Sequence, residues 1–180
     1  MHDERDTALL EDCKRGDRAA LTSLVRRYER TVFNAAYRML GNPDDAADVT
    51  QTTFMKAFEN IGRYDPKYKF FSWIYRIAVN ESINQIHKRN RFGELDENEV
   101  SSDRGPDEVT EAGRTGHDVQ AVLQELNEDH RAVVVLRHFT ECSYREISEI
   151  LQIPEKTVKS RLFSARQQMK DRLQSRGIEF

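Results

Sequence analysis

Residues 140–173 read TECSYREISEILQIPEKTVKSRLFSARQQMKDRL, and this stretch decides the architecture of the C-terminal part of the chain. Ser143 lies three residues before Glu146, just ahead of an apolar pattern, which is the spacing of a capping box at a helix N-terminus. Pro154 suits the first turn of a helix and is poorly tolerated inside one, so a second helix should begin at this proline or the next residue. The stretch therefore predicts a helix-turn-helix at about residues 144–163.

The second of these helices has an apolar side and a basic side. Between Lys156 and Arg172 there are six cations and one anion, whereas a solvated helix surface usually mixes the two signs. An ordinary helical hairpin with a basic surface is the alternative, but the charge bias favours a helix that enters the DNA major groove. The candidate DNA-binding residues off the apolar side are Lys156, Lys159, Ser160, Phe163 and Ser164.

Composition indicates an all-α protein with two small helical domains. The chain has 180 residues, of which 38% are hydrophobic and 33% charged, with only four prolines and eight glycines. Long 3.6-residue periodicities dominate, and no alternating run is long enough to predict a strand. The net charge of −3 is unusual for a DNA-binding protein, and its explanation lies in how the charge is distributed along the chain.

The cysteine and histidine patterns exclude the common metal and disulfide frameworks. Two cysteines and five histidines are scattered without a C-x-x-C, so the sequence predicts no metal or other cofactor and a reducing, cytoplasmic setting. The charged start of the chain does not resemble a signal peptide. The longest apolar runs are far shorter than a membrane span.

Residues 1–92 predict a first helical domain. A long apolar stripe ends at Gly41, and the following Asn42-Pro43 pair predicts a capped start for the next helix. We assign that helix a buried stripe that includes Ala47, and an outward polar surface. Spacing alone favours a solvated surface over a binding one. The residues of the outward surface are Asp45, Asp48, Gln51, Thr52 and Glu59.

The last helix of this domain, from about Phe70 to Phe92, combines aromatic rings with polar hydrogen-bond donors. A stripe with a period of four runs from Ser72 to Lys88. Rings and cations together suit single-stranded nucleic acid, because bases stack on rings and cations hold phosphates. Burial in the core is the simpler interpretation for Trp73 or Tyr75 taken alone. The candidate single-strand-binding residues are Trp73, Arg76, Asn80, Asn84, Lys88 and Arg91.

Residues 93–116 predict a flexible acidic linker. Eight acidic and two basic residues give this segment a charge of −6, and glycines interrupt any periodicity. The linker explains the acidic total of a chain whose flanking domains carry basic surfaces. Residues 117–180 then predict a second domain of four helices, in which Asn127 caps one helix. Arg137 and Tyr144 lie next to the recognition helix and can contact phosphates there.

Three motifs occur in order: DAADVTQTTF (45–54), WIYRIAVN (73–80) and SYREISEILQIPEKTVKSRL (143–162). With an acidic linker between the second and third, the sequence resembles bacterial RNA polymerase sigma factors of the extracytoplasmic-function (ECF) class over nearly its whole length. The resemblance implies a promoter-specificity subunit, without catalytic residues, that acts in a stress or envelope response. The partners it implies are core RNA polymerase, promoter DNA and an anti-sigma factor.

The resemblance also implies a role for each region. The outward surface of the 45–61 helix would dock on the β′ clamp helices of the polymerase. The 73–91 helix would melt and read the −10 element, with Asn80 near an extruded base. The linker would thread toward the active centre, and the second domain would read the −35 element and contact the β flap.

The sequence departs from the usual family pattern at a few positions. Ala47 and Thr52 replace glutamates that are common in the clamp-docking helix. Ser148 replaces an alanine, Ser164 stands where an arginine is frequent, and Asn127 replaces a proline at a helix start. The first two bear on clamp docking, and Ser164 on one contact at the −35 element.

Two other classes of function remain as alternatives. A stand-alone helix-turn-helix regulator would normally dimerise to read two half-sites, and the sequence shows no long heptad pattern for a dimer. An enzyme acting on nucleic acid would need clustered carboxylates, a P-loop or a nucleophile motif, and none is present. Association with core RNA polymerase separates the sigma factor from both alternatives.

Overall fold

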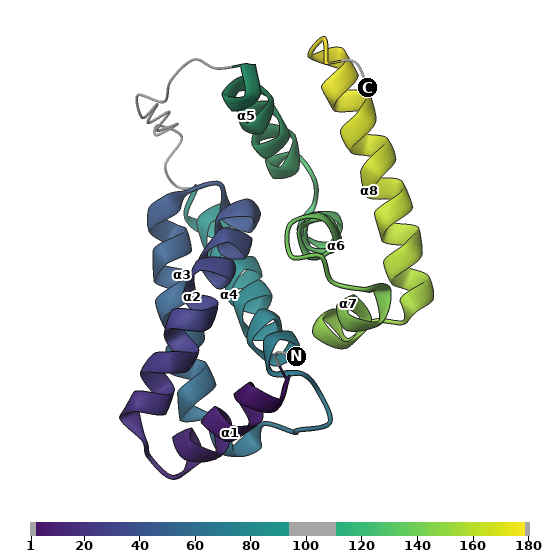
Figure 1. Cartoon of the computed structure of the whole chain (residues 1–180). Coiled ribbons are helices and arrows are strands. Elements are labelled where there is room, and N and C mark those ends of the chain that lie inside the picture. Colours follow the sequence, from purple (N-terminus) through teal and green to yellow (C-terminus); the bar gives the residue numbers. More distant parts are fainter. Residues whose placement is uncertain (1–2, 94–110, 179–180) are drawn as a thin grey trace.

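The computed structural model describes residues 3–93 and 111–178, which form helices joined by short turns (Figure 1). This part of the chain contains no strand, so the predicted all-α class is confirmed. The elements are α1 (Asp3–Lys14), α2 (Arg18–Leu40), α3 (Pro43–Glu59), the 3-10 turn η1 (Ile61–Arg63), α4 (Phe70–Gly93), α5 (Glu111–Gln124), α6 (Glu128–His138), α7 (Tyr144–Leu151) and α8 (Glu155–Ser175).

The predicted helix caps are present. Asn42 accepts hydrogen bonds from the first-turn amides of α3, and Asn127 accepts one from the His130 amide of α6. Ser143 and Glu146 form the reciprocal capping box of α7. These caps satisfy amides that have no partner inside a helix. They form as the sequence predicts because each depends only on residues within one turn.

The helix-turn-helix is also confirmed. Gln152 ends α7 in the left-handed conformation, with φ of 55°, and α8 begins directly after Pro154. The Ser148 hydroxyl donates to the Ile153 carbonyl at 2.6 Å and so ties α7 to the turn. The predicted apolar side of α8, including Val158, Leu162 and Ala165, is buried.

One predicted boundary and one predicted burial differ from the structure. The irregular segment does not extend to Gly116, because α5 begins at Glu111. The glycines of this segment do not favour the start of a helix. Extending a helix that already exists is easier, because each residue that is fixed adds one hydrogen bond. The buried part of α5 therefore supports an additional helical turn before it. Ala47 was expected to be buried but is exposed, and the buried side of α3 begins with Ala46 and Val49 before it reaches the expected Phe54 and Ala57. The rest of the expected acidic linker, residues 94–110, lies outside the described residues.

The two halves of the molecule share one hydrophobic core. Helix α7 packs against α4, while α5 and α6 pack against α2 (Figure 1). Gly41 lies at this junction. It ends α2 with φ of 71°, and a Cβ atom there would come within 2.9 Å of the Gln124 side chain. The glycine that caps α2 therefore also permits the close approach of α5.

Candidate nucleic-acid and protein interfaces

The exposed side of α8 carries the residues expected to read DNA. Lys156, Lys159 and Ser160 are exposed, and Phe163 is 76% exposed although it is large and apolar. Ser164 is half-buried. An exposed aromatic ring among cations on a recognition helix suits the thymine methyl groups and phosphates of a major groove.

Tyr144 brings two of the candidate cations together. The Arg137 guanidinium lies 5.3 Å from the centre of the Tyr144 ring, and the Lys159 ammonium lies 5.9 Å from it. Arg137 also donates to the Cys142 carbonyl at 3.0 Å, which fixes its position beside α7. The two cations and the phenol at the start of α7 suit a DNA phosphate.

Cys142, whose carbonyl accepts the hydrogen bond from Arg137, is buried. Burial raises the pKa of its thiol to about 11. The thiol therefore stays protonated near neutral pH, which makes it a poor nucleophile.

The polar stripe of α4 is shorter than the sequence predicts. Ser72 is fully buried, and so is not on the surface. Arg76 is half-buried, and its Nη2 donates to the Glu149 carbonyl of α7 at 2.7 Å. The residues of the stripe that lie exposed are Asn80, Asn84, Lys88 and, one turn further, Arg91.

The aromatic residues near the start of α4 divide between core and surface. Phe70 and Tyr75 are buried. Trp73 is half-buried, and its ring centroid lies 5.4 Å from that of Tyr64. Tyr68 is 43% exposed. Rings that remain partly or largely accessible for base stacking therefore include Trp73 and Tyr68, and the sequence reasoning did not select Tyr68.

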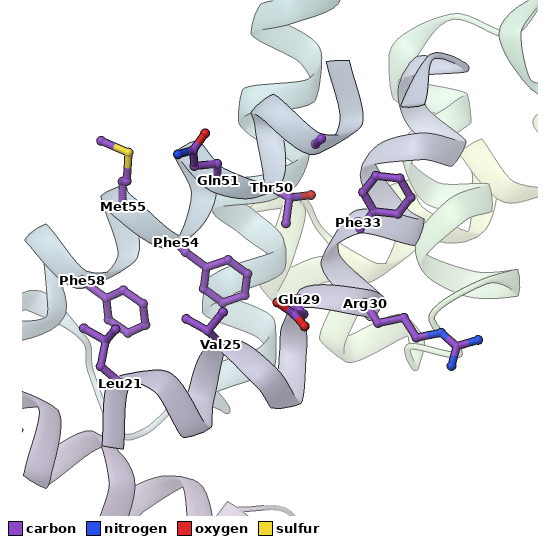
Figure 2. Close-up of a pocket in the computed structure, with 11 residues that line it drawn as sticks. Leu21, Val25, Glu29, Arg30, Phe33, Thr50, Gln51, Phe54, Met55 and Phe58 are labelled. Carbon is purple, nitrogen blue, oxygen red and sulfur yellow. The ribbon is translucent and has the colours of Figure 1, made fainter. Parts of the chain in front are cut away.

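An apolar groove lies between α2 and α3 (Figure 2). Met55 at its rim is 56% exposed. The sequence did not indicate this groove, because the residues that line it have the same helical spacing as residues that pack into the core. The signal that could have indicated it is Met55, an apolar residue off the buried stripe. The lining includes Leu21, Val25, Phe33, Phe54, Met55 and Phe58, with Gln51 at the edge.

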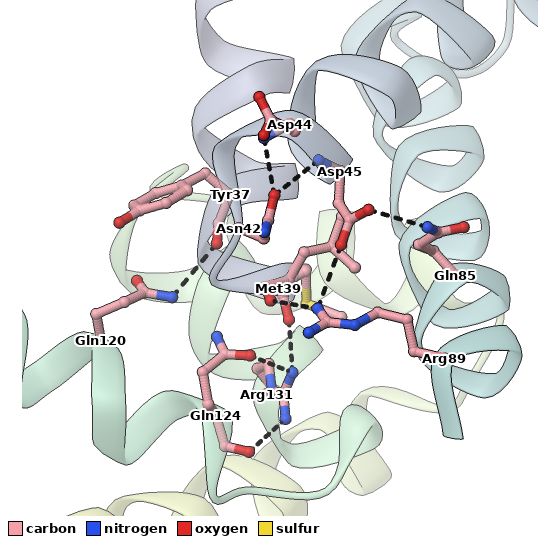
Figure 3. Close-up of polar contacts among 11 residues, drawn as sticks. Tyr37, Met39, Asn42, Asp44, Asp45, Gln85, Arg89, Gln120, Gln124 and Arg131 are labelled. Atoms are coloured by element: carbon pink, nitrogen blue, oxygen red, sulfur yellow. Dashed lines mark hydrogen bonds and ion pairs between the residues drawn. The ribbon is translucent and has the colours of Figure 1, made fainter. Parts of the chain in front are cut away.

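The outward surface of α3 contains most, but not all, of the predicted residues. Asp48, Gln51 and Glu59 are exposed, and Thr52 is half-buried. Asp45, by contrast, is half-buried. Its carboxylate turns toward α4 and accepts hydrogen bonds from Gln85 at 3.1 Å and Arg89 at 3.2 Å (Figure 3). Asp45 therefore ties α3 to α4.

Neither a metal centre nor a membrane-spanning helix is found in the described part of the chain. Among residues 3–93 and 111–178, no three His, Cys, Asp or Glu side chains come together as metal ligands would. Within the same residues, no helix has both the length and the apolar character needed to cross a bilayer.

Comparisons with known proteins agree over most of the chain. Residues 24–92 match the model of Sigma-70 region 2, and residues 117–169 match that of Sigma-70 region 4. The ECF RNA polymerase sigma factor SigW of Bacillus subtilis is 33% identical over 177 residues, covering 91% of this chain and 94% of SigW. The RNA polymerase sigma-H factor of Pseudomonas aeruginosa is 31% identical, covering 95% of both chains.

A solved structure has the same arrangement of helices. CnrH in complex with the cytosolic domain of CnrY has a TM-score of 0.73 to this chain and is 25% identical. The match covers 95% of this chain and 98% of CnrH.

Proposed function

The chain belongs to the ECF RNA polymerase sigma factors, and from this premise we propose how its surfaces divide the work of promoter recognition. The expected family is confirmed, so the protein is a promoter-specificity subunit of bacterial RNA polymerase. We assign core docking and the −10 element to residues 1–92, and the −35 element to residues 117–180. The observation that carries this division is the exposed basic and aromatic side of α8, opposite an apolar side on which Val158, Leu162 and Ala165 are buried.

The exposed donors of α4 support single-strand binding at the −10 element. Asn80 and Asn84 offer amides to base edges, and Lys88 and Arg91 lie further along the same helix. Extruding a base costs a few kcal/mol of stacking. The half-buried Trp73 and Arg76 supply a ring and a cation that can offset this cost.

Replacing Lys159 by alanine should weaken binding of the holoenzyme to promoter DNA. If the ammonium contacts one phosphate, the slope of log affinity against log salt concentration should fall by about 1. The measurement is fluorescence anisotropy of a promoter duplex over a salt series. Lys14→Ala, a matched change on α1, should leave the slope unchanged. An affinity equal to wild type at every salt concentration would remove Lys159 from the DNA interface.

We propose that the outward surface of α3 and the adjacent groove bind the β′ clamp helices, and that the second domain contacts the β flap. The outward surface supplies Asp48, Gln51 and Glu59, and the groove supplies apolar area next to them. Polar residues around an apolar centre are the usual composition of a specific protein interface.

Co-elution with core RNA polymerase tests this assignment. Wild-type protein should elute with the core enzyme on size exclusion, whereas Asp48→Arg should elute alone. The free energy of unfolding of Asp48→Arg should remain within about 0.5 kcal/mol of the wild-type value, because Asp48 is exposed. Asp171→Arg, an exposed charge reversal on α8, is the control and should co-elute. If Asp48→Arg co-elutes at wild-type levels, the outward surface of α3 is only solvated.

The same experiment decides against the runner-up function, a stand-alone helix-turn-helix regulator, which would not co-elute with the polymerase. We propose further that the protein is non-catalytic, works in the cytoplasm in a stress or envelope response, and is held by an anti-sigma factor. The similarity to CnrH in its complex with CnrY supports such a partner.

A further inference from the structure

The loop between η1 and α4, residues 64–69, is folded into a tight turn by its own residues. Asp65 and Pro66 stand at the first two positions of this turn, where their residue types are favoured. The Tyr68 amide donates to the Asp65 carbonyl at 3.1 Å, and the Lys67 amide donates to the Asp65 carboxylate at 3.0 Å. The turn presents the exposed Tyr68 side chain just ahead of α4.

A buried hydroxyl group closes this turn. Tyr64 is buried, and its hydroxyl donates to the Tyr68 carbonyl at 2.6 Å. Its ring packs against Phe70 and Trp73, with centroid distances of 5.9 and 5.4 Å. A phenylalanine would pack there in the same way and would have no polar group to satisfy. The hydroxyl of Tyr64 therefore serves the loop, whereas its ring serves the core.

Tyr64 rests on a network that reaches α1. Its neighbour Phe70 also packs against Tyr28 of α2, with 5.4 Å between the ring centroids. The Tyr28 hydroxyl donates to the buried carboxylate of Asp6 on α1, which also forms an ion pair with Arg27. Burial and the hydrogen bond to Asp6 raise the pKa of Tyr28, so its hydroxyl remains a donor at neutral pH. Helix α1 packs against both α2 and η1 at this end of the domain (Figure 1), and buried contacts from α1, α2 and α4 therefore hold the loop.

The loop places a ring and a cation together. The Arg76 guanidinium lies 6.0 Å from the centre of the Tyr68 ring. An exposed ring offers a stacking face to a base, and a cation beside it can hold the adjacent phosphate. We infer that Tyr64 is a positioning residue for the −10 element, because its hydroxyl holds Tyr68 where an unpaired base can stack on it. This inference rests on the proposed role of residues 1–92 at the −10 element.

Fixing the Tyr68 ring before DNA arrives should strengthen the stacking contact. A ring on a loose loop must lose its conformational freedom when a base stacks on it, and this loss of entropy weakens binding. Removing the Tyr64 hydroxyl should therefore weaken binding only where a base is present to stack. The effect depends on one position of the strand, which separates positioning from a general loss of stability.

Binding of the holoenzyme to single-stranded DNA tests this role. The probes are fluorescent oligodeoxynucleotides with the non-template −10 sequence of a mapped promoter, either intact or with an abasic site at each position in turn. Tyr64→Phe should bind the intact strand about fivefold more weakly than wild type, which is the effect of one hydrogen bond. At one abasic position, the two proteins should bind equally. Tyr68→Ala should lose about tenfold on the intact strand, and its loss should vanish at the same position.

Two further variants complete the comparison. Asp65→Ala removes the carboxylate to which the Lys67 amide donates, and Asp65 is exposed. It should therefore repeat the position-specific loss even if Tyr64→Phe is poorly folded. Tyr75→Phe removes another buried hydroxyl group of the first domain, outside the loop, and should bind every strand as wild type does.

Two results would overturn the inference. One is wild-type affinity of both Tyr64→Phe and Asp65→Ala for the intact strand. The other is a loss that is equal on the intact strand and on every abasic strand. Asn80→Ala reports separately on the proposed function. If it weakens binding while the two loop variants do not, the −10 assignment stands and only the role of Tyr64 fails.

Discussion

Arg131→Met should lower the free energy of unfolding by about 3 kcal/mol, because it removes the donors that several buried carbonyls share. Arg131 is 7% exposed. Its guanidinium donates to the Met39 carbonyl at 2.5 Å, the Gln124 carbonyl at 2.7 Å and the Leu126 carbonyl at 2.9 Å. Desolvation lowers the pKa of this guanidinium, but an arginine remains charged at neutral pH.

The measurement is thermal or urea unfolding followed by circular dichroism. Arg145→Met is the matched control. Its side chain is 82% exposed and pairs with Glu149 along the same helix, so the substitution should cost less than about 0.5 kcal/mol. Equal losses for the two variants would contradict the central structural role of Arg131.

Met55→Asp should weaken binding to core RNA polymerase by roughly 30-fold or more, since losing an apolar anchor at an interface costs about 2 kcal/mol or more. Met55 is 56% exposed at the rim of the groove, where a carboxylate stays solvated in the free protein. Folding should therefore be unaffected, and the loss should appear only in the complex.

Biolayer interferometry on immobilised core enzyme measures this affinity. Ser23→Asp provides the control, because Ser23 is exposed on α2 and is not part of the groove lining. It should bind as wild type does. Wild-type affinity for Met55→Asp would limit the docking surface to the polar residues of α3.

What the sequence predicted well depends on short-range interactions. The capping box of Ser143 and Glu146, the start of α8 after Pro154 and the glycine at the end of α2 each depend on a single turn of chain. The buried side of α8 follows from its period. Side chains such as Lys159 and Phe163 were then placed on the exposed side by elimination.

The features that the sequence did not predict depend on contacts between different helices. Asp45 has the right spacing for an outward residue, but α4 lies close enough for Arg89 and Gln85 to bind it. The groove beside Met55 is lined by residues of both α2 and α3. The hydrophobic pattern of a single helix indicates neither the contacts of Asp45 nor the groove.

The packing of the two domains against each other also escaped the sequence analysis, which treated them as independent bodies on a linker. Two signals were available. Arg131 lies four residues before Val135, on the apolar side of α6, and Gln120 lies between Val119 and Val122. A polar residue on an apolar stripe indicates a buried acceptor, and here the acceptors are the last carbonyls of α2.

A gel shift on a mapped promoter, and on a version with altered spacing between the −10 and −35 elements, tests the central claim most directly. Each DNA is mixed with the free protein, with core polymerase, or with both. Two DNA-reading surfaces reinforce each other only when something holds them at the distance of the two elements. We predict that only the complete complex binds tightly and that altered spacing weakens it. Tight binding by the free protein that depends on this spacing would contradict the account and indicate a stand-alone regulator.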